Sequence, residues 1–283
     1  MRRLIVTGDD FGLAVPVNEA IEEAHRHGIL TAASLMVGAE AAADAVERAR
    51  RLPTLRVGLH LVLVEGRSVL PPEAIPDLVD RRGEFSTHLV RAGFAYFFRP
   101  GARRQLEAEI RAQFQAFRDT GLPMDHVNAH NHMHLHPTVL GLILKVGREF
   151  GLKAVRVPYE PPIRSWRASR KALLLKLATA FALAPWLALL RWRLNRANVR
   201  ANEFVFGMND SGAMRTELVL QMLRHLPPGV SEIYFHPATL RCPQIDRTMS
   251  DYDHRAEFEA LISSSVRDAV RACEVRRIAF SDL

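Results

Sequence analysis

The chain has 283 residues, of which 48% are hydrophobic and 24% charged, with two cysteines and a formal net charge of +7. This composition is typical of a globular protein and excludes a disordered or a disulfide-stabilised chain. The length suits one α/β barrel, because such barrels reach ~250 residues as single domains. We therefore expect a single barrel domain over residues 1–283.

The positive charge is concentrated in one segment. Residues 151–200 contain eleven Lys or Arg and a single acid, Glu160, so this segment alone exceeds the net charge of the chain. A basic segment on a slightly acidic body indicates an anionic surface or ligand at that place. The basic residues alternate with leucine and alanine more than with stacking aromatics, so we do not expect nucleic-acid binding.

Short apolar runs alternate with helical patterns along the chain. In order, strands are expected at 4–7, 31–37, 55–60, 126–130, 153–157, 232–235 and 277–281, with a loop at 8–14. Helices are expected from Pro16 to Gly28, at 39–52, over 86–120 with a break near Pro100, from Pro137, at 217–226 and at 254–273. This alternation is typical of βα units around a parallel sheet and predicts one α/β barrel, incomplete or distorted.

Two adjacent carboxylates, Asp9 and Asp10, follow the first expected strand. One can ligate a metal while the other accepts a proton, because neighbouring carboxylates differ in their affinity for protons. We interpret Asp9 as the base. A turn or a helix cap is the alternative for two aspartates beside glycine.

Histidines occur at two further strand ends. His60 ends the third expected strand, at the edge of the sheet where barrel active sites assemble. A second group alternates along a strand that runs into a loop, and period two places its members on one face: His126, Asn128, His130, His132 and His134. Four members of this group, His126, Asn128, His132 and His134, are expected to orient the metal ligands, and His136 to start the next helix. A surface histidine tract and a polar strand terminus remain alternatives.

One carboxylate and two histidines from three strand ends make a metal site with open coordination positions. A divalent ion there can acidify water and polarise a carbonyl for amide hydrolysis. His236 and Arg156 are candidates for the acid and the charge stabiliser. Their ordinary alternatives are a strand terminus and a pair with a core acid.

These residues resemble the YdjC-like carbohydrate deacetylases, which include chitooligosaccharide deacetylases, and within them the hopanoid-biosynthesis-associated HpnK branch. The resemblance spans nearly the whole chain and rests on residues 8–13, 58–61, 126–134, 235–237, 255–261 and 280–283. It implies a distorted TIM-like barrel, one divalent ion (Zn²⁺ or Mg²⁺) on Asp10, His60 and His130, and Asp9 as proton acceptor. Many relatives carry His-x-Asp-Ser-His where this chain has Asn128 in place of the aspartate, which puts an acidic role at that position in doubt.

An insertion at about 159–203 is expected to be helical. Residues 172–190 are mostly apolar between basic flanks, and the uncharged stretch 177–190 has fourteen residues, below the ~20 needed to span a membrane. This pattern favours a helix at a membrane interface, over residues 170–196, or a buried hairpin. Phe94, Tyr96, Phe97 and Phe98 offer a second exposed apolar segment.

The resemblance implies removal of an N-acetyl group from an N-acetylglucosaminyl hopanoid lipid, or from soluble chitooligosaccharides. We expect a cytoplasmic protein, peripheral on the inner face of the membrane. The alternatives are a metallohydrolase for phosphate esters or another amide, and a peripheral lipid-binding protein without catalysis, whose binding would not depend on metal.

Overall fold

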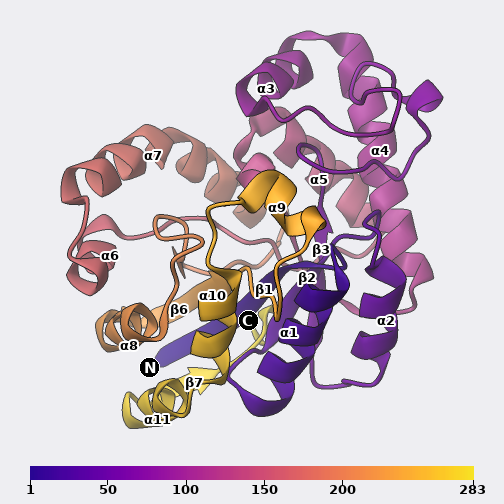
Figure 1. Ribbon diagram of the computed structural model, residues 1–283. Coiled ribbons are helices and arrows are strands. Elements are labelled where there is room, and N and C mark those ends of the chain that lie inside the picture. Colours follow the sequence, from indigo (N-terminus) through magenta and orange to yellow (C-terminus); the bar gives the residue numbers. More distant parts are fainter.

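A parallel sheet forms the centre of the protein, as the computed structural model of residues 1–283 shows (Figure 1). Its strands are β1 (Arg2–Phe11), β2 (Ala32–Leu35), β3 (Arg56–Leu61), β4 (Met124–Ala129), β5 (Phe204–Phe206), β6 (Gly229–Phe235) and β7 (Val275–Arg277). The order is β4-β3-β2-β1-β6-β5, and β7 pairs with the start of β1. Because all pairs are parallel, the carboxyl ends of the strands share one edge.

Helices surround this sheet (Figure 1). They are α1 (Val15–His27), α2 (Ala42–Arg50), α3 (Leu89–Phe98), α4 (Pro100–Asp119), α5 (Pro137–Glu149), α6 (Pro162–Ser169), α7 (Leu173–Arg196), α8 (Thr216–His225), α9 (Pro243–Met249), α10 (His254–Ile262) and α11 (Ser264–Ala272). Three short 3-10 helices are η1 (Pro72–Ala74), η2 (His130–Leu135) and η3 (Phe280–Asp282). The βα alternation expected from the sequence is confirmed.

The sheet is curled, and irregular backbone connects its two outer strands. The N–H of Val127 in β4 donates to the carbonyl of Ala154, and that of Val155 donates to Arg200. Farther along, the N–H of Val205 in β5 donates to Tyr159. The strand expected at 153–157 therefore exists only as isolated bridges. The result is a parallel half-barrel surrounded by helices, consistent with the expected TIM-like form.

Apolar periodicity explains where the first helices lie. In α1 the predicted face of Val17, Ala20, Ile21 and Ala24 is buried, and a proline occupies the first turn. The helical region expected over 86–120 breaks where predicted, since α3 ends at Phe98 and α4 begins with proline. Alternate strand side chains such as Leu4 and Val6 join one large core, whereas Ile5 on the other face belongs to a separate cluster of six buried residues.

Three expected boundaries are wrong. The strand β1 continues through the expected loop 8–14 as far as Phe11, because its end pairs with β2. The helix expected over 254–273 breaks at Ser263, where the chain packs against the end of α1 through the carbonyl of Leu261. The last strand lies at Val275–Arg277, and the residues after it form η3, whose N–H groups donate to the carboxylate of Asp125.

The insertion is helical, as expected, and consists mainly of α6 and α7. By length and composition α7 could cross a membrane, although the sequence predicted too short a stretch. Its second half is attached to the body through buried Leu187, Leu190 and Leu194, and its first half through buried Lys176. Most of its remaining apolar side chains are exposed. In Figure 1, α3 and α7 both lie in the upper half of the view, whereas the N-terminus lies below.

Candidate metal centre and catalytic pocket

Three predicted ligands meet at the carboxyl edge of the sheet. Asp10 lies near the end of β1, His60 near the end of β3, and His130 directly after β4. Asp10 Oδ1 is 3.2 Å from His60 Nε2 and 3.3 Å from His130 Nδ1, and the two nitrogens are 3.4 Å apart. Atoms bound to one ion at about 2.0–2.2 Å have this separation. The geometry therefore brings together the set that the sequence predicted.

The surroundings of Asp10 fit a divalent cation. The residue is 1% exposed, yet neither carboxylate oxygen accepts a hydrogen bond. Burial by itself raises the pKa of Asp10, but His130 and His60 outweigh this effect and hold the pKa well below its ordinary value. The backbone of Asp10 is left-handed, with φ of 61°. Such a conformation is costly for a non-glycine residue and is typical of functional sites.

Asn128 orients His60. Its Oδ1 lies 2.7 Å from His60 Nδ1, which can therefore donate a hydrogen bond while Nε2 keeps a free lone pair. The amide nitrogen of Asn128 donates to Ser34 and, at 3.3 Å, to Asp9. An ionised aspartate at this position could accept from His60 but could not donate to Asp9. Asn128 thus links a candidate metal ligand to the expected base without carrying charge.

Asp9 is held by a buried ion pair. Arg156 donates both terminal nitrogens to Asp9, at 2.5 and 2.9 Å, and also binds the carboxylate of Glu232. Burial raises the pKa of Asp9, but the charge and hydrogen bonds of Arg156, together with the nearby His60 and His236, outweigh this effect and hold the pKa far below its ordinary value. Arg156 is 0% exposed and does not line the catalytic pocket. Arg156 therefore pairs with core acids, which is the alternative that the sequence left open. It can affect the pocket through Asp9.

A pocket of about 220 Å³ opens beside Asp10, His60 and His130. Asp9, His60, His130 and His236 line it. The Nδ1 of His236 is 3.3 Å from Ser211 Oγ, and burial lowers the pKa of His236 to about 4. At neutral pH its imidazole is therefore neutral, so one ring nitrogen carries a proton and the other a lone pair.

The other histidines of the run do not share one face as predicted. Alternation ends at Ala129, because η2 begins at His130 and its Asn131 and His132 adopt left-handed backbone conformations. His132 Nε2 lies 3.1 Å from the hydroxyl of Tyr234, and His134 is buried without a hydrogen-bond partner. His136 is the residue before α5, as expected.

His126 lies near the start of β4, farther from the carboxyl edge of the sheet than the three candidate ligands. Its ring bonds to Asp125 and to Ser34, and it stacks on Phe280 with 4.4 Å between centroids. A Cβ at Gly58 would lie 2.5 Å from this ring, which explains the glycine two residues before His60. A chain of hydrogen bonds thus runs from the C-terminal turn to the site.

Several pocket residues were not identified from the sequence. Tyr234 lines the pocket, and Glu232 binds Arg156. Both lie in β6 at two-residue spacing from His236, which directly follows the strand, so period two could have found them. Glu65, whose carboxylate is 3.8 Å from His130 Nε2, and Ser211 lie in loops without any periodic signal.

Comparison with known proteins relates the chain to one protein family. The family model described as YdjC-like protein matches residues 3–272. The chain is 26% identical over 263 residues to a carbohydrate deacetylase of Thermoanaerobacter pseudethanolicus, which covers 93% of this chain and 90% of that protein. It is 40% identical over 163 residues to a carbohydrate deacetylase of Brevibacillus brevis. This aligned region is 56% of this chain and 59% of that protein, which is less than two thirds of its length.

A solved structure has a similar fold over nearly the whole chain. The crystal structure of an Enterococcus faecalis protein named for cellobiose-phosphate cleavage matches with a TM-score of 0.77 and 26% identity, covering 99% of this chain and 98% of that one. Sequence, fold and the family model agree over almost the entire length. The chain therefore belongs to the YdjC-like protein family.

Proposed function

We propose that this protein is a metal-dependent hydrolase that removes an N-acetyl group from an amino sugar. The observation that carries the proposal is the buried set Asp10, His60 and His130, with Asp9 directly beside it. The similarity to carbohydrate deacetylases supports the reaction class.

Asp10, His60 and His130 would hold one divalent ion, which when bound acidifies water and polarises the amide carbonyl. Asp9, kept ionised by Arg156, accepts the proton of the water whose oxygen adds to the acetyl carbonyl carbon. That proton passes to the nitrogen as the C–N bond breaks, so the products are acetate and the free amine. His236 supplies a neutral imidazole to the pocket wall. Two imidazole nitrogens favour Zn²⁺ over Mg²⁺, which prefers oxygen ligands.

For the substrate we propose an N-acetylglucosaminyl hopanoid lipid, taken from the inner membrane surface with residues 170–196 at the interface. Exposed apolar side chains on α7 support this choice: Leu174 is 82% exposed and Phe181 84%. Arg167, Arg170 and Lys171 precede α7 as exposed cations, which suit an anionic lipid surface. Soluble chitooligosaccharides are the second candidate, because a large charged cavity also adjoins the catalytic pocket.

The test is free acetate released from the N-acetylglucosaminyl lipid and, separately, from chitooligosaccharides. Wild type is compared with Asp9→Asn and His130→Ala, each with confirmed folding. We expect acetate from the lipid and a loss of about a hundredfold or more in both variants. Acetate from neither substrate by metal-loaded protein would overturn the deacetylase proposal and favour phosphate esters or metal-independent lipid binding.

A further inference from the structure

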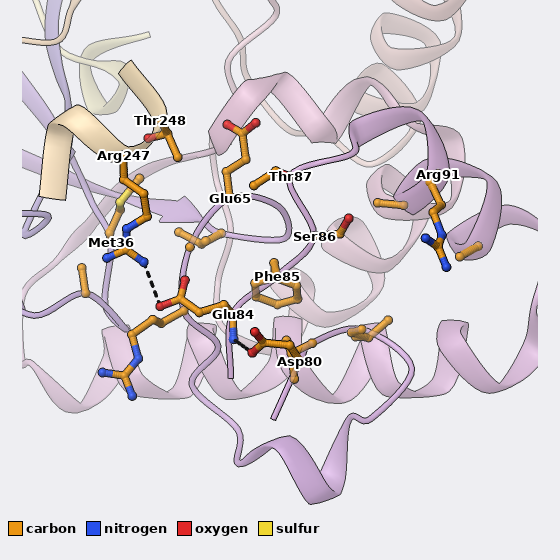
Figure 2. A pocket seen from close by; sticks show the side chains of 18 of the residues that line it. Met36, Glu65, Asp80, Glu84, Phe85, Ser86, Thr87, Arg91, Arg247 and Thr248 are labelled. Carbon is orange, nitrogen blue, oxygen red and sulfur yellow. Dashed lines mark hydrogen bonds and ion pairs between the residues drawn. The ribbon is translucent and has the colours of Figure 1, made fainter. Parts of the chain in front are cut away.

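Two cavities adjoin the catalytic pocket on different sides. A cavity of about 640 Å³ shares Glu65 and Thr248 with the pocket (Figure 2). A second hollow of about 520 Å³, which we call the apolar groove, shares Leu89, Asn131 and His132 with it. A substrate whose N-acetyl group lies in the pocket can therefore extend in either direction.

The two cavities differ in chemistry. Nine charged side chains line the larger one, including the pair Arg247 and Glu84 that Figure 2 shows. No Lys, Arg, Asp or Glu lines the apolar groove, which lies between α3, η2 and Trp186 of α7. Covering charged groups with an apolar molecule costs free energy, whereas covering apolar groups with it is favourable. An apolar part of a substrate therefore fits the groove better than the charged cavity.

The groove wall also leaves aromatic area uncovered. Phe94 is 62% exposed, Phe98 68% and Trp186 45%, and the rings of Phe94 and Phe98 are stacked. Their neighbour Tyr96, expected among the exposed aromatics, is instead buried and donates its hydroxyl to Leu63. The helix α3 thus uses Tyr96 for packing and presents its phenylalanines to the groove and solvent. Contiguous exposed apolar area of this kind marks binding sites.

We propose that the apolar groove binds the apolar aglycone of a glycosylated substrate while its N-acetylated sugar occupies the catalytic pocket. This inference rests on the proposed deacetylase function and locates the second half of the substrate. The catalytic pocket is smaller than the ~300–1,000 Å³ typical of ligand sites, so it suits little more than the sugar. Phe94 and Trp186 would determine specificity, because they provide the groove with large aromatic surfaces on opposite helices.

The experiment compares methyl and decyl 2-acetamido-2-deoxyglucosides, which differ only in the apolar aglycone, below the critical micelle concentration. In wild type we expect kcat/KM for the decyl compound to exceed that for the methyl compound by about tenfold or more, through KM. In Phe94→Ser/Trp186→Ser the preference falls to about twofold or less, while the methyl compound is turned over as in wild type. Phe181→Ser, which changes a still more exposed aromatic of α7 outside the groove, keeps the preference.

Equal turnover of both compounds by wild type, or an unchanged preference in the double variant, would overturn the proposal. A groove that instead binds a second copy of the chain would give dimers in sedimentation, lost in the double variant, and no preference for the decyl compound. If no acetate is released from either compound, the function proposal fails, and calorimetric binding of decyl glucoside tests the groove alone. Binding to wild type but not to the double variant supports the groove; equal or absent binding refutes it.

Discussion

The amide of Asn128 connects the proposed metal ligands with the proposed base. Its side chain accepts from His60 and donates to Asp9, and these two hydrogen bonds need opposite groups on one residue. The sequence placed Asn128 near the candidate ligands but did not predict these two hydrogen bonds, because a sequence does not show which side chains are in contact. The same holds for Arg156, since nothing in the sequence indicates that Asp9 and Glu232 are its partners.

Two substitutions separate the roles of Asn128. Asn128→Ala removes the acceptor that orients His60, so metal affinity should fall about 10–100-fold. Asn128→Asp keeps an acceptor for His60, so its metal affinity should stay close to that of wild type. The new carboxylate would lie near Asp9, however, and should raise the pKa of Asp9, moving the acid limb of the pH profile of kcat/KM to higher pH. Competition with a chromophoric chelator measures the affinities; equal losses in both variants would contradict this role.

At the element scale, strand ends were predictable and exposed faces were not. His60 and the His130 region could be placed because apolar runs end there and parallel strands end at a common edge. The side of α7 that packs against the body could not be predicted, because the helix is apolar on nearly all sides. In its first half, only the buried Lys176 marks the packed side. That lysine bonds to Asp210 at 2.6 Å and to Ser165.

The exposed face of α7 predicts binding to anionic vesicles. Leu174→Ser/Phe181→Ser should reduce cosedimentation with phosphatidylglycerol vesicles about tenfold, since both side chains would insert among lipid chains. Added salt should weaken binding of the wild type, because cations beside α7 contribute to it. Leu240→Ser is the matched control, an apolar residue 67% exposed in the loop between β6 and α9. Wild type that remains in the supernatant would contradict membrane association.

At the scale of the whole molecule, the alternation of strands and helices predicted a barrel, and the sheet follows it through six connected strands. The side between β4 and β5 was less predictable. Residues 153–157 have the composition of a strand, yet only Ala154 and Val155 form bridges. Here Arg156 turns its side chain to Asp9, and Val157 bonds to the amide of Asn202 instead of a strand. Hydrogen bonds to side chains here replace the regular hydrogen bonds between strands, and no local sequence pattern predicts this replacement.

A metal titration of acetate release decides whether Asp10, His60 and His130 hold a catalytic ion. Protein freed of metal with a chelator is supplied with Zn²⁺ in steps, and the release of acetate is followed for wild type and Asp10→Asn. We expect wild-type activity to rise to a plateau at one ion per chain, while Asp10→Asn stays about a hundredfold lower. Full activity without metal, or full recovery of Asp10→Asn at one equivalent, would contradict a catalytic ion held by Asp10, His60 and His130.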